Sequence, residues 1–151
     1  MLLSKPSRDD AALAQVIRYA GKRVCSRSEV LAYLHRRGLP PQTAARALKA
    51  AAALNVVDDR ACARLCCNHW ARLGFAASAI EEKLALKSVD AGAVRIALLE
   101  LKKEESDRKR AQRWINAQKN RTPKQLARSL AARGYDETVI EELIVYTHEE
   151  L

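Results

Sequence analysis

The chain has 151 residues and a formal net charge of +9 at pH 7, and only 5% of its residues are aromatic. A chain of this length buries roughly 70% of its unfolded surface, which excludes any requirement for disulfides or a structural metal. The excess of Lys and Arg favours a polyanionic partner, either nucleic acid or an acidic protein surface, although a basic surface without a specific partner has the same net charge.

No stretch is typical of a targeting or membrane segment. Leu2 and Leu3 are followed at once by Ser4, Lys5 and Pro6, so we expect no secretory signal. No apolar run approaches the ~20 residues that span a bilayer. Four cysteines without a secretory signal are typical of reduced thiols. We therefore expect a cytoplasmic protein that does not contact a membrane.

Residues 9–55 predict a unit of three helices, over about 9–21, 27–37 and 41–54, after a flexible leader of residues 1–8. Asp9 or Asp10 is the expected N-cap of the first helix. Ser26 with Glu29 three positions later forms a capping-box pattern at the start of the second helix. Gly38 supplies the C-terminal stop of that helix before two prolines open the third.

Residues 56–101 predict a second unit of the same kind. Asp58 is the expected N-cap of its first helix, and Asp59 favours the positive end of that helix. An acid/base pair of carboxylates is the alternative interpretation of these two residues. Ser78 with Glu81 repeats the capping pattern for the next helix, and Asp90 is the expected cap of the last.

Residues 102–151 predict a third unit. Its first part, residues 102–118, is highly charged and reads as a helix on the rim of the molecule or as a bridge between units. Thr122 and Gln125 form a capping box around Pro123, which suits the first position of a helix. The final helix is expected from about Glu137.

The same apolar pattern occurs three times along the chain. A shift of 50 places Val30, Leu34, Arg37, Leu39, Ala47 and Leu48 on Ile80, Leu84, Lys87, Val89, Ala97 and Leu98, and a shift of 96 places the same six on Leu126, Leu130, Arg133, Tyr135, Leu143 and Ile144. Such periodicity predicts a repeat architecture, and one three-helix unit buries too little apolar surface to stand alone. The predicted fold is all-α, with three tandem three-helix repeats in an elongated, curved, solenoid-like array.

No constellation is typical of catalysis. The sequence lacks a Gly-rich phosphate loop and the H-E-x-x-H and G-x-S-x-G patterns. Cys62, Cys66 and His69 share one helical face beside Cys67, but a zinc site takes four ligands, usually from two chain segments. Cysteine also behaves as a small buried hydrophobe. We expect no enzymatic activity, no catalytic residue, no metal and no cofactor.

Basic residues carry the functional signal. The candidate partner-binding residues are Arg27, Arg36 and Arg37 in the first unit, Lys83 and Lys87 in the second, and Arg108, Lys109, Arg110, Arg113, Lys119, Arg121, Lys124, Arg128 and Arg133 in the third. If the units align, these cations form an intermittent stripe suited to phosphates or to a carboxylate-rich groove. Arg37, Lys87 and Arg133 have an alternative role, because a cation at the negative end of a helix stabilises it by ~0.3–1 kcal/mol without any partner.

These residues resemble those of the RecX family of bacterial recombinase regulators, over residues 10–143. The similarity lies in S-x-S-E-V-L-x-x-L-x-x-R-G at 26–38, in Val57-Asp58-Asp59, in Gly74 with Ile80, Leu84 and Lys87, and in the stretch 130–135. Two positions depart from the family pattern. The family usually has an aromatic residue near Cys62, and Ser88 stands where a glycine is usual.

The resemblance implies tandem three-helix repeats without enzymatic activity. It further implies a protein that binds the RecA filament along its helical groove, bridges neighbouring protomers, and contacts single-stranded or duplex DNA within the filament. Such a protein, expected to be a monomer, would block filament growth and suppress ATP hydrolysis and strand exchange. A direct DNA-binding repeat protein and a scaffold for acidic proteins are the alternative hypotheses.

Overall fold

The chain is described by a computed structural model over residues 7–149; residues 1–6 of the expected leader lie outside the described residues. The described part forms nine helices: α1 (Arg8–Ala20), α2 (Arg27–Arg36), α3 (Pro41–Ala53), α4 (Asp59–Arg72), α5 (Ala77–Leu86), α6 (Ala91–Glu104), α7 (Asp107–Ala117), α8 (Pro123–Ala132) and α9 (Glu137–Glu149). Between residues 7 and 149 the only β-type pairing is an isolated bridge between Cys25 and Val57. The all-α prediction is therefore confirmed.

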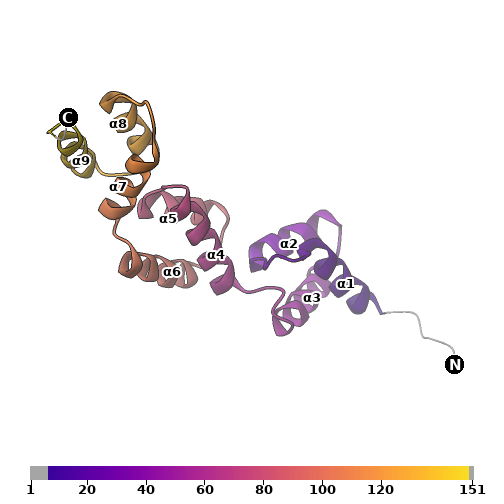
Figure 1. Ribbon diagram of the computed structural model, residues 1–151. Coiled ribbons are helices and arrows are strands. Elements are labelled where there is room, and N and C mark those ends of the chain that lie inside the picture. The colour runs from indigo at the N-terminus through magenta and orange to yellow at the C-terminus, as the bar shows by residue number, and fades with distance from the viewer. Residues whose placement is uncertain (1–6, 150–151) are drawn as a thin grey trace.

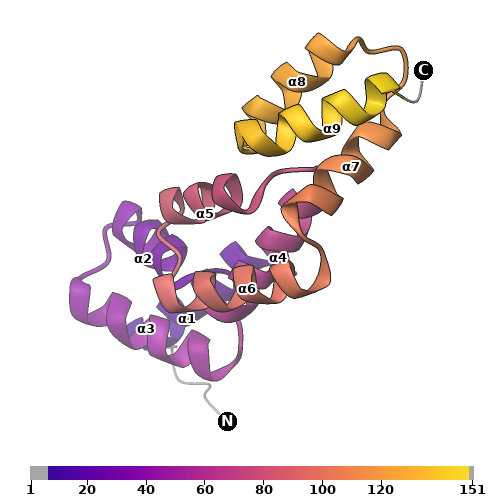
Figure 2. The same ribbon diagram turned by 90° about the vertical axis from the view of Figure 1, so that its left-hand side faces the viewer.

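The helices form three successive groups along an elongated body (Figures 1 and 2). We refer to α1–α3, α4–α6 and α7–α9 as the first, second and third helix groups. Each group has its own cluster of buried apolar side chains, and the third cluster also takes in Ala76 from the loop before α5. This arrangement fits three tandem units, and the unit boundaries given above remain a proposal.

The helix starts follow the capping chemistry in most places. Ser26, Asp58 and Asp90 each accept a hydrogen bond from the backbone N–H three positions later. Thr122 forms the expected capping box with Gln125. The four N-caps are confirmed because a cap depends only on residues within one helical turn. At Ser26 the capping box is only half formed, since the Glu29 carboxylate accepts from Arg23 at 3.0 Å.

The first helix begins earlier than predicted. Ser7, and not Asp9 or Asp10, is the N-cap: its hydroxyl accepts from the backbone N–H of Asp10 at 3.1 Å. The Asp10 carboxylate accepts from the backbone N–H of Ser7 at 3.3 Å, which completes a capping box. Residues 7 and 8 therefore belong to the first helix group and not to a leader.

The start of α5 also differs from the prediction. Ala76 is the N-cap, and no side chain of the same helix caps it. The backbone N–H of the buried Ala77 donates instead to the carboxylate of Asp107 at 3.1 Å, and the Ser78 hydroxyl donates to the carbonyl of Gly134 at 2.9 Å. The Ser78–Glu81 capping prediction is wrong because a neighbouring helix group supplies the acceptor.

The charged stretch 102–118 is not one helix. It breaks between α6 and α7, where Glu105 is extended and Ser106 caps α7 by accepting from the backbone N–H of Lys109 at 3.2 Å. Ala111, Trp114 and Ile115 of α7 are buried in the third apolar cluster. The segment therefore packs as a core helix of the third group.

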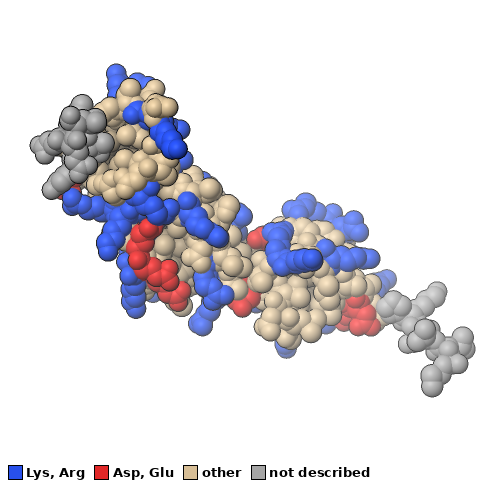
Figure 3. Space-filling model, in the orientation of Figure 1, with Lys and Arg blue, Asp and Glu red and all other residues tan. Residues whose placement is uncertain are grey.

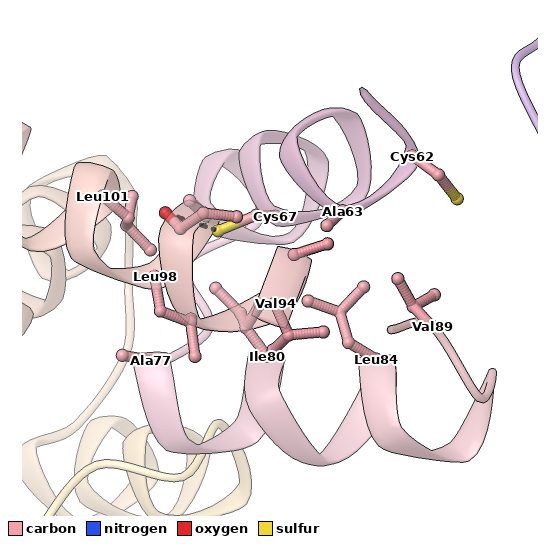
Figure 4. Packing of buried hydrophobic residues seen from close by; sticks show 13 residues of the cluster. Cys62, Ala63, Cys67, Ala77, Ile80, Leu84, Val89, Val94, Leu98 and Leu101 are labelled. Carbon is pink, nitrogen blue, oxygen red and sulfur yellow. Dashed lines mark hydrogen bonds between the residues drawn. The ribbon is translucent and has the colours of Figure 1, made fainter. Parts of the chain in front are cut away.

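Corresponding apolar positions of the three groups have matching environments. Leu34, Leu84 and Leu130 all have no exposed surface. Figure 4 shows Ile80 and Leu84 of α5 pointing between α4 and α6 in the second cluster. Full burial of a leucine side chain stabilises the folded state by ~1.5–3 kcal/mol, so these positions anchor each group.

The turn after the second helix of each group is also repeated. Arg37, Lys87 and Arg133 are the C-cap residues, with φ/ψ of −83/0°, −84/0° and −86/1°. The next residue has positive φ in each case: 74° at Gly38, 54° at Ser88 and 89° at Gly134. This left-handed position explains the family preference for glycine, and it makes Ser88 the strained member of the three.

Replacing Ser88 by glycine is expected to stabilise the protein by about 0.5–1 kcal/mol, because glycine adopts a positive φ without a Cβ penalty. The midpoint of urea unfolding measures this change. Gly38→Ser is the matched control and makes the reverse change. A Cβ at Gly38 would meet no atom within 4 Å, so the only cost in stability is that of a positive φ. An unfolding midpoint that falls in Ser88→Gly would contradict this account.

Acidic residues hold the groups together at equivalent positions. Asp59 in the first turn of α4 accepts from the backbone N–H of Arg27 and from that of Asp90, both at 2.8 Å. Asp107 in the first turn of α7 plays the same part toward Ala77. These contacts assign Asp59 a structural role in joining the first and second groups, in addition to its place at the helix start.

Candidate polyanion-binding surface

Most of the predicted binding cations are exposed. Arg27, Arg36, Lys109, Lys119, Lys124 and Arg128 have exposed side chains, and within residues 7–149 none of them forms an ion pair. In the view of Figure 3, Lys and Arg gather over the first group and around α6 and α7, and acidic side chains form smaller patches. The basic surface is therefore intermittent, as the sequence predicts.

Arg110 is the exception and corrects the prediction. Its side chain has no exposed surface, so it is not available to a partner. The guanidinium donates to the carboxylates of Glu105 and Asp107 at 3.1 and 2.8 Å, and to the carbonyl oxygens of Glu105 and Phe75 at 2.9 and 3.4 Å. Sequence patterns do not distinguish such a buried cation from its exposed neighbours, because every acceptor but Asp107 lies outside its helix.

Two further predicted binding residues, Arg113 and Arg108, form contacts within the molecule. Arg113 donates to the carboxylate of Glu105 at 2.9 Å and to the carbonyl oxygen of Ala71 at 2.9 Å. The hydrogen bond from Arg113 holds the pKa of Glu105 below its usual range, and the charge of Arg110 acts in the same direction. Arg108 forms an exposed ion pair with Glu142 at 2.8 Å, which remains open to exchange with a partner.

Aromatic rings support the cations of the first helix group. Tyr19 of α1 and Tyr33 of α2 stack with their ring centroids 4.1 Å apart and their planes 9° from parallel. The guanidinium of Arg23 lies 5.5 Å from the Tyr19 ring, and that of Arg37 lies 6.0 Å from the Tyr33 ring. Both distances are within the range of cation–π attraction.

The second group repeats this arrangement with different rings. The Lys83 ammonium lies 4.5 Å from the centroid of Phe75 and 5.8 Å from that of Trp70. The Lys87 ammonium lies 5.5 Å from the Trp70 ring. Lys87 is exposed while Trp70 is half-buried, so the ring supports the cation from below.

In the third group, Trp114 is the supporting ring. The guanidinium of Arg133 lies 4.5 Å from Trp114 and 5.6 Å from Phe75, and that of Arg121 lies 5.7 Å from Trp114. Arg133 is half-buried and donates to the carbonyl oxygen of Leu73 at 3.3 Å. It therefore links the second and third groups, whereas Arg121 is exposed and suited to a partner.

We call these cations and rings the cation–aromatic ladder: Arg23, Arg37, Lys83, Lys87, Arg121 and Arg133 over Tyr19, Tyr33, Trp70, Phe75 and Trp114. The C-cap residues Arg37, Lys87 and Arg133 are equivalent in the three groups, and each lies over a ring. A ring beneath a long cation limits its conformations and leaves the charge at the surface. Phosphates and carboxylates are the groups that such a ladder can bind.

Sequence reasoning missed the rings and Arg23. Two local signals were available, because Tyr33 precedes the C-cap residue Arg37 by four positions and Tyr19 precedes Arg23 by the same interval. Most of the remaining contacts join different helices or loops, as between Trp70 of α4 and Lys87 after α5. Spacing within one helix does not reveal contacts of that kind.

Within the described residues, His, Cys, Asp and Glu form no group of three or more that would hold a metal ion. In the same part of the chain, no helix combines the length and hydropathy needed to cross a membrane.

Known proteins similar to this chain include several that carry the name RecX, although no family model matches the chain. The proteins named "Regulatory protein RecX" from Mycobacterium ulcerans (strain Agy99) and Mycobacterium marinum (strain ATCC BAA-535 / M) are each 29% identical to it over 156 residues, which cover 94% of this chain and 87% of the relative.

Solved structures show the same relationship in fold. The crystal structure of RecX from Lactobacillus salivarius matches with a TM-score of 0.74 at 14% identity, over 95% of this chain and 98% of that one. A second structure, the crystal structure of regulatory protein RecX, matches with a TM-score of 0.69 at 16% identity, over 95% of this chain and 80% of its own. The chain is thus similar in sequence to RecX proteins along almost its whole length and shares their fold, which confirms its resemblance to the RecX family.

Proposed function

We propose that this protein regulates a RecA recombinase by binding along the groove of the RecA filament, where it inhibits ATP hydrolysis, filament extension and strand exchange. The protein acts as a cytoplasmic monomer and performs no catalysis of its own. The observation that carries the proposal is the cation–aromatic ladder, in which equivalent cations recur in three successive helix groups of a RecX-like chain.

The repeated ladder suits a repeated partner. Each exposed cation contributes little alone, because charge pairs at a surface are typically worth under about 1 kcal/mol. Three groups in succession along one chain place such contacts on successive subunits, so their effects combine as in multivalent binding. An elongated body with Asp59 and Asp107 fastening its joints is suited to that geometry.

Inhibition requires more than binding. A ligand shifts a filament between states only if it binds one state more tightly than the other. A clamp that spans neighbouring protomers favours the one spacing of protomers that matches its own. We therefore expect the protein to hold the filament in one state and to slow ATP turnover and the addition of further protomers.

The test is the DNA-dependent ATPase activity of the cognate RecA. We expect an amount of this protein well below the RecA concentration to lower the steady-state rate, because one bound clamp affects several protomers. A variant with Lys49, Arg64 and Lys103 changed to Gln is the net-charge control for variants of the ladder cations. These exposed side chains form no ring contact or ion pair within residues 7–149. An ATPase rate that stays unchanged at every ratio of the two proteins would reject the proposal.

Direct DNA binding is the second candidate, favoured by the stacked pair of Tyr19 and Tyr33 with Arg23 and Arg37 at its edges. Aromatic platforms beside cations bind single-stranded nucleic acid without sequence preference. Tight binding to single-stranded DNA at physiological salt without RecA would support this candidate. A dissociation constant that requires RecA would favour the filament instead. A scaffold for other acidic proteins would bind such partners with no recombinase present.

A further inference from the structure

A pocket of about 310 Å³ lies between the first and second helix groups. Its charged and titratable lining residues are Arg23, Glu29, Cys62, Cys66, His69 and Lys87, and Trp70 lies among them. It contains two thiols one helical turn apart on α4, together with cations from the loop after α1 and from the end of α5. Nothing in the proposed binding surface makes use of these thiols.

The four free cysteines differ sharply in access. Cys25, Cys62 and Cys67 are buried, with 0%, 3% and 1% of their surface exposed. Cys66 is half-buried and lines the pocket. A reagent that enters the pocket therefore reaches the Cys66 sulfur before that of any other cysteine.

The surroundings of Cys66 favour the thiolate. A hydrogen bond from the Cys62 thiol lowers the pKa of Cys66 to about 6, against the opposing effect of burial. The charges of Lys87 and Arg23 act in the same direction as the hydrogen bond, and Glu29 of α2 opposes them. The single S–H of Cys62 is shared between Cys66 and the Glu29 carboxylate, which accepts from it at 3.9 Å. The pKa of Cys62 is raised by the hydrogen bond with Cys66, by burial and by the carboxylates of Glu29 and Asp59.

We propose that Cys66 is a site of reversible mixed-disulfide formation with small anionic disulfides such as glutathione disulfide. The Cys66 thiolate attacks one sulfur of the disulfide, a new S–S bond forms to Cys66, and the original S–S bond breaks. The departing thiolate takes a proton from water. Lys87 attracts the carboxylates of the incoming disulfide, and Arg23 does so by exchanging its partly exposed ion pair with Glu29, which is 3.0 Å long.

The helix prevents Cys62 from resolving this adduct. Residues four apart on a helix have Cβ atoms about 5–6 Å apart, whereas a disulfide requires about 3.5–4.5 Å. Cys62 therefore donates a hydrogen bond to its neighbour but forms no bond with it while α4 is intact. The mixed disulfide persists until a thiol in solution reduces it.

The adduct would also alter the ladder, a consequence that rests on the proposed function. Cys66, Trp70 and Lys87 line the same pocket. A glutathione group on Cys66 brings carboxylates next to Lys87 and competes with a partner for that charge. Oxidising conditions would then weaken the inhibition of RecA, and a reducing thiol would restore it.

The experiment incubates the native protein with glutathione disulfide and locates adducts by mass spectrometry of peptides. We expect one adduct per chain, on Cys66, and none in Cys66→Ser. The rate should rise with pH through a midpoint near 6, and at pH 6 it should exceed that of free glutathione by about tenfold, because a larger thiolate fraction outweighs the weaker nucleophilicity of a low-pKa thiol.

Two variants test the cause. Cys62→Ala should move the midpoint upward toward the ordinary thiol range, and Lys87→Gln should reduce the preference for glutathione disulfide over the cationic disulfide cystamine. Faster modification of Cys25 or Cys67 than of Cys66, a wild-type midpoint above 8, or an intramolecular disulfide in place of the adduct would each overturn the proposal.

The two proposals fail separately. An adduct on Cys66 that leaves RecA inhibition unchanged contradicts the coupling to the ladder and not the modification site. Unmodified protein that never affects RecA contradicts the proposed function, whereas the mass-spectrometric result stands without it.

Discussion

Replacement of Arg110 by methionine is expected to lower the free energy of unfolding by about 3 kcal/mol. The side chain is fully buried, and its guanidinium joins α7 to the loops before α5 and before α7 through Phe75 and Glu105. Methionine fills part of the volume but leaves two carbonyl oxygens without their donor. For a chain of this size the melting temperature should fall by roughly 6–12 °C.

Arg108→Met is the matched control, because Arg108 lies two positions before Arg110 on the same helix. Arg108 and Glu142 retain 56% and 48% side-chain exposure, so loss of their ion pair should cost under about 1 kcal/mol. Chemical denaturation monitored by circular dichroism measures both variants. Equal stabilities of the two variants would show that Arg110 is not the structural connection described above.

Arg110 also affects how the stability of the contact between the second and third helix groups depends on pH. Together with Arg113 it holds the pKa of Glu105 below its usual value, so Glu105 contributes stability at neutral pH. That contribution is present above the unfolded-state pKa and is lost as the pH falls through the lower folded-state pKa. The difference between wild type and Arg110→Met should therefore narrow as the pH falls below about 4.

The combined change of Arg37, Lys87 and Arg121 to Gln is expected to weaken binding to the RecA–DNA filament about 100-fold. These cations are exposed and lie over Tyr33, Trp70 and Trp114. Three contacts of about 1 kcal/mol each combine to about 3 kcal/mol, which is roughly 100-fold in the dissociation constant. Arg121 is changed in this test and Arg133 is kept, because Arg133 also donates to the Leu73 carbonyl and so links the second and third groups.

The variant with Lys49, Arg64 and Lys103 changed to Gln removes the same net charge from positions outside the ladder. Its binding should weaken only severalfold, through the loss of long-range attraction. Fluorescence anisotropy of labelled filaments at several salt concentrations measures both variants. Equal weakening by the two triple variants would show that net charge, and not the ladder, governs binding.

Local patterns were sufficient for most helix starts. Ser26, Asp58, Asp90 and Thr122 cap helices as predicted, because a cap depends on a side chain and an N–H within one turn. The prediction failed at Ser78, where the acceptor for the helix start comes from Asp107, thirty residues away. It also failed at Ser7, because Asp9 and Asp10 carry the same capping chemistry two and three positions later.

The sequence by itself determined that the chain is all-helical, that Leu34, Leu84 and Leu130 are buried at corresponding positions, and that the surface is basic. Periodic burial of apolar side chains is a property of each helix and repeats with it. Only the tertiary structure decided which cations are available: Arg110 lies in the core, Arg133 fastens a joint, and Arg37 and Lys87 stay exposed over rings. The physical reason is that burial and pairing of a charge depend on acceptors and rings from other helices, whose positions are set by packing and not by spacing along the chain.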